Sequence, residues 1–342
     1  MPLNELGEFG LIERIRKLLP ANPPHVVEGI GDDVAVLAHP GSDYLLATCD
    51  VQVEGVHFLP RFLAPRQLGR RVMAVNLSDL AAAGGAPLWA LVSLCLPENT
   101  QPAFVEELYG GMLEELHPAE GVIVGGNVAA SPCGLVIDVS LLGRVAPEHL
   151  VLRKGAREGD RILVTGFPGD SKAGFELLRR PDLLASSSIR ERLVAKHLTP
   201  SPRLWQGRAL GRSGRVRAMV DVSDGLLADL GHICQASGLG AQVWVEEVPV
   251  SDAAREAAGI CGGDVVKWAL SGGEDFELLF TAGEEDVPCI MELLRERRDV
   301  PCRVIGRMTA PHLGMEVIFP DGSRTLADPF AAGSGWDHFR KI

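Results

Sequence analysis

The 342-residue chain lacks the sequence signs of several common protein classes. No apolar run approaches the ~20 residues that a membrane-spanning helix needs, and the N-terminus lacks the basic, then apolar pattern of a secretion signal. The 7 cysteines are scattered, odd in number and never spaced C-x-x-C, which argues against a zinc site and a disulfide framework. We therefore expect a cytoplasmic protein without membrane contact, whose cysteines are reduced and mostly buried.

The chain also has fewer basic than acidic residues. Lys and Arg number 33 against 45 Asp and Glu, which gives a net charge of −12. This balance argues against nucleic acid as a partner, because binding a phosphate backbone depends on a basic surface. It does not argue against a nucleotide, since bound Mg²⁺ can reverse the local sign of the charge.

Two familiar nucleotide motifs are missing as well. The dinucleotide pattern G-x-G-x-x-G is absent, and G-F-P-G-D-S-K at Gly166–Lys172 does not have the spacing of a P-loop. We expect the second segment to be a strand-to-helix turn.

Apolar segments with strand and helix patterns alternate along the chain, which predicts an α/β or α+β fold of two domains, residues 1–147 and 148–342. The stretch Val145–Gly159, with its proline and glycines, is the expected connection. Expected strands are Tyr44–Cys49, Trp89–Leu96, Gly121–Val124, Leu135–Val145, Arg161–Thr165, Arg217–Val220, Ala241–Val245, Phe276–Thr281 and Cys302–Met308. Expected helices are an N-terminal one ending before Pro20, Pro65–Ala83, Ala103–Leu116, one to about Arg180, one from about Pro202 to Gly211, and Asp224–Ser237.

Aspartates stand where these apolar segments break off: Asp32 and Asp33 in G-I-G-D-D, Asp50, Asp79, Asp221 and Asp224. Their apolar neighbours indicate that the carboxylates converge in a cleft. Several carboxylates in a medium of low dielectric constant cannot all stay ionised unless cations neutralise them. Carboxylate-rich oxygen sites suit Mg²⁺, which is commonly shared with substrate phosphates. The sequence therefore predicts metal-assisted phosphate chemistry.

Each motif also has a plain structural interpretation. Asp224 could cap the helix that follows it, and G-I-G-D-D could be an acidic turn. His57, between apolar neighbours, could be a hydrogen-bonded core histidine. S-G-G-E-D-F-E at Ser271–Glu277 could be a tight turn.

The order and context of the motifs resemble one family, thiamine-monophosphate kinase of the aminoimidazole-ribonucleotide-synthetase-like superfamily. The resemblance begins at G-E-F-G-L-I-E-R-I (Gly7–Ile15) and ends at G-W-D-H-F (Gly335–Phe339). Its most specific blocks are N-L-S-D-L-A-A, the D-V-S-D-G-L-L-A-D-L-G-H-I segment and S-G-G-E-D-F-E-L. It implies an N-terminal α/β domain whose sheet pairs across a homodimer, a C-terminal α+β domain, and ATP in the cleft between them.

The resemblance also implies roles for particular residues. Those matching metal positions are Asp33, Thr48, Asp50, Asp79, Asn127, Asp221 and Asp224. Those matching ATP contacts are Gly126, in a glycine turn, Arg153 and Ser223, and those matching thiamine-phosphate contacts are His57, Glu274 and Trp336. The family usually reads G-G-D-T where this chain has G-G-N-V, so Asn127 offers a carbonyl oxygen without a negative charge. Cys49 also replaces a more usual hydroxyl residue.

The implied activity is ATP-dependent phosphorylation of thiamine phosphate to thiamine diphosphate, with several Mg²⁺ ions and no general base. One alternative is another ATP-using member of the superfamily, such as a selenophosphate synthetase or the hydrogenase maturation dehydratase. This chain lacks the cysteine-bearing terminal segments usual in those two. A binding protein that has lost catalysis, suggested by Asn127, is the second alternative.

Overall fold

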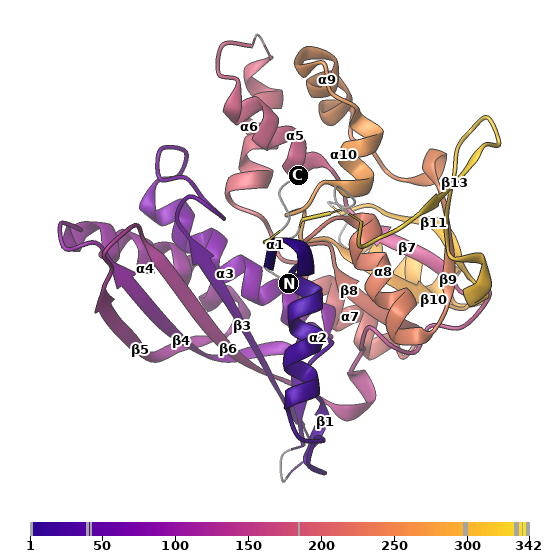
Figure 1. Ribbon diagram of the computed structural model, residues 1–342, viewed down its shortest axis with the longest axis horizontal. Coiled ribbons are helices and arrows are strands. Elements are labelled where there is room, and N and C mark those ends of the chain that lie inside the picture. Colours follow the sequence, from indigo (N-terminus) through magenta and orange to yellow (C-terminus); the bar gives the residue numbers. More distant parts are fainter. Residues whose placement is uncertain are drawn as a thin grey trace.

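The structure, a computed structural model, describes residues 3–38, 41, 43–183, 185–296, 300–331, 335, 336, 338 and 339. It contains two β-sheets, each packed against helices, which are drawn in purple and in pink to yellow in Figure 1. This architecture confirms the predicted mixed α/β (α+β) class. Among the described residues, none of the helices is both long enough and apolar enough to cross a bilayer.

The first sheet has the strand order β1-β2-β3-β6-β4-β5, and its neighbours are antiparallel except for the parallel pair β4–β5. Its longest helix, α3, packs on β3, β4 and β6, and α4 packs beside α3. Alternate residues of β6 and β4 are buried on this helix-covered face. The strands are Val26–Glu28 (β1), Ala35–Leu37 (β2), Tyr44–Val53 (β3), Ala86–Leu96 (β4), Val122–Ala130 (β5) and Val136–Val145 (β6), and the helices Pro65–Ala82 (α3), Pro102–Leu116 (α4) and the 3₁₀ turn His117–Ala119 (η1).

The second sheet has the order β13-β12-β9-β11-β7-β10-β8, with β12–β9 as its parallel pair. Its strands are Arg161–Thr165 (β7), Val216–Asp221 (β8), Gly240–Trp244 (β9), Leu278–Ala282 (β10), Cys302–Thr309 (β11), Met315–Ile318 (β12) and Arg324–Ala327 (β13). The helices around it are Asp170–Arg179 (α5), Ser187–Leu198 (α6), Leu204–Ser213 (α7), Leu226–Ser237 (α8), Asp252–Cys261 (α9), Val265–Ser271 (α10) and Val287–Leu294 (α11), with 3₁₀ turns Pro147–His149 (η2), Val245–Glu247 (η3) and Pro311–Leu313 (η4).

Helix α3 belongs to the first half but also packs against α7 and β8 of the second. Helices α3 and α7 approach closely at Gly207 of α7, where an added Cβ would lie 2.0 Å from the carbonyl oxygen of Ala81 on α3. Only glycine permits this spacing. The contact places the C-terminal part of α3, which carries Asp79, beside the end of β8, which carries Asp221.

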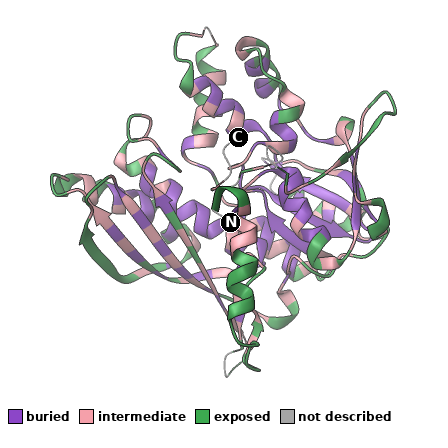
Figure 2. Cartoon of the chain, viewed as in Figure 1, coloured by how far each residue is buried: buried purple, intermediate pink, exposed green. Residues whose placement is uncertain are grey.

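The N-terminal helices α1 (Leu3–Leu6) and α2 (Glu8–Leu18) run along the outside of the molecule, where α2 is largely exposed (Figures 1 and 2). Helix α2 ends before Pro20, as predicted. Phe9 attaches it to the second half, with its ring centroid 4.7 Å from that of His232 and 5.7 Å from that of Phe330.

The prediction for the cysteines is only partly right. All seven are free, as expected, but Cys234 alone is buried, whereas Cys49, Cys133 and Cys289 are exposed. Cys49 is exposed because it points away from the helix-covered face of its strand. On the opposite face its thiol donates to Asp138 at 3.1 Å.

Candidate active site

Three of the predicted aspartates meet between the two halves. Asp33 lies in the loop before β2, Asp79 on α3 and Asp221 at the end of β8. One carboxylate oxygen of each lies within 4.8 Å of the others. Two hydroxyls contribute to the cluster, because Thr48 donates to Asp79 at 2.5 Å and Ser78 donates to Asp221 at 2.6 Å.

Burial and mutual repulsion make this cluster electrostatically unusual. Burial, reinforced by the charge of Asp33, raises the pKa of Asp221 from 3.8 to about 8. Burial also raises the pKa of Asp79 well above its ordinary value, with further contributions from Asp50 and Asp221. The pKa of Asp50 rises to about 6 for the same main reason. These groups therefore resist ionisation unless a cation accompanies them.

The cluster has the properties of a divalent-cation site. The Oδ2 atom of Asp33 is buried and has no hydrogen-bond partner among the described residues. Its neighbours offer carboxylate and hydroxyl oxygens, the donor set that Mg²⁺ prefers. The residues present thus fit a magnesium ion.

Arg153 closes one side of the cluster. Its Nε donates to Asp33 at 3.0 Å, and its backbone N–H donates to Asp32 at 2.9 Å. Burial opposes the charge of Arg153, but attraction to Asp33 outweighs it and raises the pKa of the guanidinium. Arg153, the predicted ATP contact, is therefore paired in this structure with Asp33, a predicted metal ligand.

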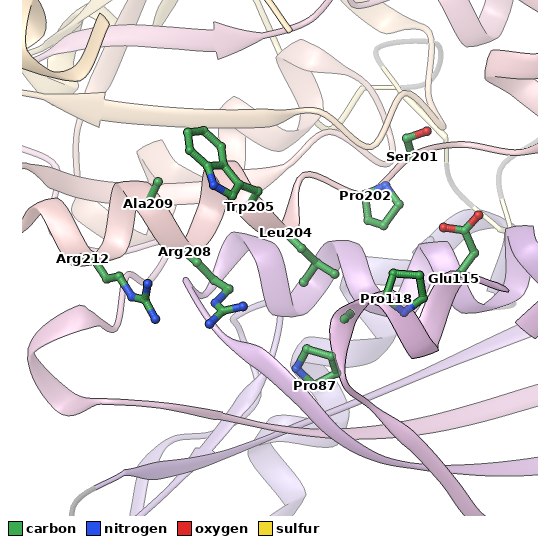
Figure 3. A pocket seen from close by; sticks show the side chains of 11 residues that line it. Pro87, Glu115, Pro118, Ser201, Pro202, Leu204, Trp205, Arg208, Ala209 and Arg212 are labelled. Carbon is green, nitrogen blue, oxygen red and sulfur yellow. The ribbon is translucent and has the colours of Figure 1, made fainter. Parts of the chain in front are cut away.

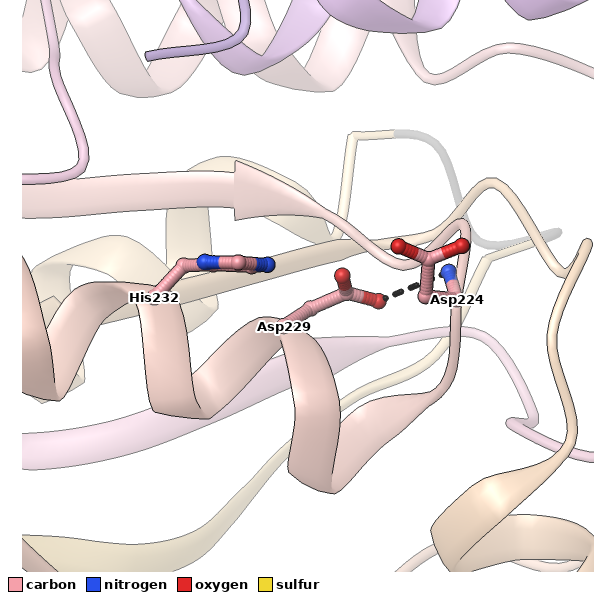
Figure 4. A group of neighbouring side chains, drawn as sticks. All are labelled: Asp224, Asp229 and His232. Atoms are coloured by element: carbon pink, nitrogen blue, oxygen red, sulfur yellow. Dashed lines mark hydrogen bonds between the residues drawn. The ribbon is translucent and has the colours of Figure 1, made fainter. Parts of the chain in front are cut away.

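Asp224 belongs to a second group, with Asp229 and His232, in which one ligand atom of each lies within 4.8 Å of the others (Figure 4). Asp229 Oδ2 accepts the backbone N–H groups of Ser223, Asp224 and Gly225 at 3.0 to 3.2 Å. The interpretation of Asp224 as the helix cap is wrong, because Gly225 stands at the N-cap position of α8. Asp229, one turn into α8, takes the N–H groups that precede the helix. Burial lowers the pKa of His232 to about 3.

The three predicted substrate residues lie in a connected region. The ring of His57 is 4.8 Å from that of His338, which is 5.9 Å from the ring of Trp336. The backbone N–H of Trp336 donates to the carbonyl of Asp224 at 3.0 Å. Ser223 accepts the backbone N–H of Glu274 at 2.7 Å, so this region adjoins the aspartates.

Glu274 itself has an unusual backbone, with φ of 67° in a residue that has a side chain. Such conformations persist where the surroundings enforce them, often at functional sites. Arg71 donates to its Oε1, and His197 Nδ1 lies 3.3 Å from its Oε2. Burial opposes the charge of Glu274, but Arg71 outweighs it and lowers the carboxyl pKa. Burial lowers the pKa of His57 to about 4, so this histidine is neutral at pH 7.

Asn127 and Gly126 are not brought to the cluster within this chain. In the sheet register Asn127 is opposite Ser93, and Ser93 is opposite Asp138, whose carboxylate contacts Cys49. Residues directly opposite share a face, so Asn127 lies on the face that carries Cys49, away from Asp79. Gly126 lies within strand β5, so the expected turn is wrong; an added Cβ there would be 1.8 Å from the carbonyl oxygen of Val92.

Residues 166–169 form the expected strand-to-helix turn between β7 and α5, and residues 170–172 begin the helix. The backbone N–H groups of Gly169 and Ser171 donate to the carboxylate of Asp275 at 2.6 and 2.9 Å. A side chain of the protein thus takes the N–H groups that a P-loop offers to phosphate.

A separate groove of about 410 Å³ lies between the start of β4, the end of α4 and helix α7 (Figure 3). Pro87, Leu204, Trp205, Arg208 and Arg212 are among its lining residues. None of the predicted site residues lines it, so it lies apart from the aspartate cluster.

Comparison with known proteins gives the class of this architecture. The model of the AIR synthase related protein N-terminal domain matches residues 31–145, and that of the C-terminal domain matches residues 157–318. The chain therefore has the two-part fold of AIR synthase related proteins.

Close relatives define the family within that class. The thiamine-monophosphate kinase of Salmonella typhimurium is 37% identical over 333 residues, 97% of this chain and 98% of the relative. That of Aquifex aeolicus is 36% identical over 99% of this chain and 100% of its own length. The solved structure of AaThiL complexed with AMPPCP and TMP has a TM-score of 0.83 at 36% identity and covers 99% of both chains. This chain belongs to the thiamine-monophosphate kinase family.

Proposed function

We propose that this chain transfers the terminal phosphoryl group of ATP to thiamine phosphate, giving thiamine diphosphate and ADP. The observation that carries the proposal is the meeting of Asp33, Asp79 and Asp221 within 4.8 Å, beside the connected residues His57, Glu274 and Trp336. Relatives named for this activity are 33–37% identical over nearly the whole chain, and the AaThiL complex contains an ATP analogue together with TMP.

In this proposal Asp33, Asp79 and Asp221 hold Mg²⁺, with Thr48, Asp50 and Asp224 beside them. When bound, the ion offsets the negative charge of the two phosphorylated substrates. The acceptor is a phosphate oxygen that is already ionised near neutral pH, so no side chain has to remove a proton. The remaining task of the chain is to position two anions in line.

The other site residues supply that positioning. Arg153 and Ser223 would contact ATP, while neutral His57, Glu274 and Trp336 would surround the thiamine moiety. Trp336 can stack on its cationic ring. Residues 1–147 would carry most metal ligands, and residues 148–342 would complete the cleft. Gly126 and Asn127 remain proposed ATP and metal positions on β5.

We also propose that the chain forms a homodimer through its first sheet. The face of that sheet away from α3 exposes Val51, Trp89 and Leu91, each by more than 40%, and β5 is an open edge. Exposed apolar side chains gathered on one face favour an interface between proteins. A cytoplasmic location is proposed as well, in keeping with the seven free cysteines.

The test is an assay of ATP with thiamine phosphate across a Mg²⁺ titration, in which chromatography follows thiamine diphosphate. We expect product from the natural chain and none from Asp50→Ala or Asp224→Ala, with both variants folded by circular dichroism. Turnover near the natural rate in both variants at saturating Mg²⁺ would refute the metal-cluster mechanism. If the natural chain forms no product, the kinase proposal is rejected, and ATP binding without turnover would favour the binding-protein alternative.

A further inference from the structure

We propose that Arg71 is a positioning residue that fixes the carboxylate of Glu274 for substrate recognition. The inference rests on the proposed place of Glu274 beside thiamine phosphate. Arg71 lies on α3 in the first half of the chain, and Glu274 lies in the loop before β10 in the second. The Arg71 side chain is only 1% exposed, whereas that of Glu274 is 35% exposed.

The guanidinium of Arg71 joins three segments at one point. It donates to the carboxylate of Glu274, to the carbonyl of His197 and, at 3.4 Å, to the carbonyl of His57. Its one strong side-chain contact among the described residues is with Glu274, and the longer bond to the backbone of His57 places this pair beside a second residue of the proposed thiamine pocket. The planar guanidinium fixes the directions of its hydrogen bonds and also carries a positive charge. A lysine ammonium group carries the charge but does not fix these directions.

His197 supports the same carboxylate from the other side. Its Nδ1 lies 3.3 Å from Glu274 Oε2 and 3.1 Å from the hydroxyl of Ser171. Glu274 is therefore held at Oε1 by Arg71 of α3, while His197 of α6, neutral at pH 7 because burial lowers its pKa to about 4, lies beside Oε2. The bond from Arg71 restricts the rotation of this partly exposed carboxylate and gives it a preferred orientation toward a ligand.

The arrangement also changes how Glu274 can recognise a cation. The positive charge of Arg71 offsets the negative charge of Glu274, so the pair presents a directed acceptor with little net charge. Recognition of the thiamine ring would then depend on orientation, and orientation depends on Arg71.

A contribution to folding stability does not by itself explain why Arg71 is buried at this position. Burying a guanidinium is costly, and the Nε of Arg71 is buried without a hydrogen-bond partner among the described residues. Replacing a buried ion pair by apolar residues often leaves a protein equally stable. A charged pair that spans the two halves beside the proposed substrate residues is better explained by positioning.

The experiment compares Arg71→Lys, Glu274→Gln and the double variant by their KM values for thiamine phosphate and for ATP. We expect Arg71→Lys to raise KM for thiamine phosphate about tenfold, the size of effect typical of a lost charge-assisted hydrogen bond, with KM for ATP within about twofold. Because Arg71 acts through Glu274, adding Arg71→Lys to Glu274→Gln should change KM less than about twofold further.

Arg203→Lys is the matched control, since Arg203 forms another buried pair, with Glu277, at 2.6 Å. It should lower the melting temperature without changing KM for thiamine phosphate. An equal rise of KM in this control would overturn the inference, as would additive effects of Arg71→Lys and Glu274→Gln. If Arg71→Lys does not fold, Arg71→Met combined with Glu274→Gln removes both charges: its KM for thiamine phosphate should equal that of Glu274→Gln alone, and a further rise of more than about twofold would overturn the inference.

The two proposals fail in different ways. An unchanged KM in Glu274→Gln would remove Glu274 from the proposed substrate site. A raised KM in Glu274→Gln with an unchanged KM in Arg71→Lys would reject the role of Arg71 and leave the proposed function intact.

Discussion

Replacing Asp221 with asparagine should stabilise the magnesium-free protein at alkaline pH while it abolishes turnover. Asp221 is 2% exposed and shares its surroundings with Asp33 and Asp79. Its main neutral contact is the hydroxyl of Ser78, whose proton an asparagine carbonyl can also accept. The substitution therefore removes a buried charge and keeps the shape of the side chain.

The size and sign of the effect follow from the pKa of Asp221. Its folded-state pKa of about 8 exceeds the ordinary 3.8, so the folded protein holds a proton that the unfolded chain releases between these pH values. Stability is then lost as pH rises through this window. At about 1.4 kcal/mol per pKa unit, the aspartate costs the folded state about 5 kcal/mol at pH 8 and about 2 kcal/mol at pH 5. After about 1 kcal/mol for the weaker hydrogen bond, the variant should gain about 4 kcal/mol at pH 8 and about 1 kcal/mol at pH 5.

The assay is urea unfolding in EDTA at both pH values, with circular dichroism as the signal. Asp182→Asn is the control, because Asp182 is exposed, and it should change stability by less than about 0.5 kcal/mol. Added Mg²⁺ should stabilise the natural chain at pH 8 by mass action and the variant much less. A variant that is less stable than the natural chain at pH 8, or equally changed at both pH values, would refute the electrostatic reasoning.

Three further predictions concern the other proposed positions. Asn127→Asp should lower the Mg²⁺ concentration for half-maximal activity severalfold, because it restores a carboxylate; an unchanged titration curve would separate Asn127 from the metal site. Trp336→Ala should raise KM for thiamine phosphate about tenfold through loss of stacking, with KM for ATP unchanged, and equal effects on both values would count against stacking. Trp89→Glu should convert a dimer to a monomer in light scattering, because it places a charge on the exposed sheet face, whereas Glu148→Gln should not.

The aspartate cluster could be predicted because its signal is local. Asp79 is a charged residue among the apolar residues of its helix, and Asp221 ends a buried strand. Each aspartate therefore stands out in its own segment. Their apolar neighbours indicated that the carboxylates converge, and the structure confirms that Asp79 and Asp221 meet, together with Asp33. Strands β7, β8 and β10 and the long helix α3 were predictable for a similar reason, since each is a mostly apolar segment whose residues are largely buried.

The features that the sequence could not reveal depend on contacts between residues that are far apart along the chain. Arg71 and Glu274 are 203 positions apart, and nothing near Arg71 marks it as buried. Asp229 looks like an ordinary helix residue, although its position one turn after the D-V-S-D-G segment was an available signal. Helix α9 was missed although its apolar and polar residues alternate with a helical period; its buried face consists of small alanines, Ala253, Ala254, Ala257 and Ala258.

The charged groups between the two halves are neutralised in two opposite ways. Burial opposes the charge of Glu274 and Glu277, yet Arg71 and Arg203 outweigh it, and both carboxyl pKa values fall. Burial opposes the charge of Asp79 and Asp221 as well, but within the described part of the chain their hydrogen-bond donors are the hydroxyls of Thr48 and Ser78, and both pKa values rise. The same protein thus supplies a cation where a carboxylate must be fixed in direction. Among the described residues no cationic side chain forms an ion pair with Asp79 or Asp221, and the nearby Arg153 is paired with Asp33, which is the arrangement expected of a site whose cation arrives with the phosphorylated substrates.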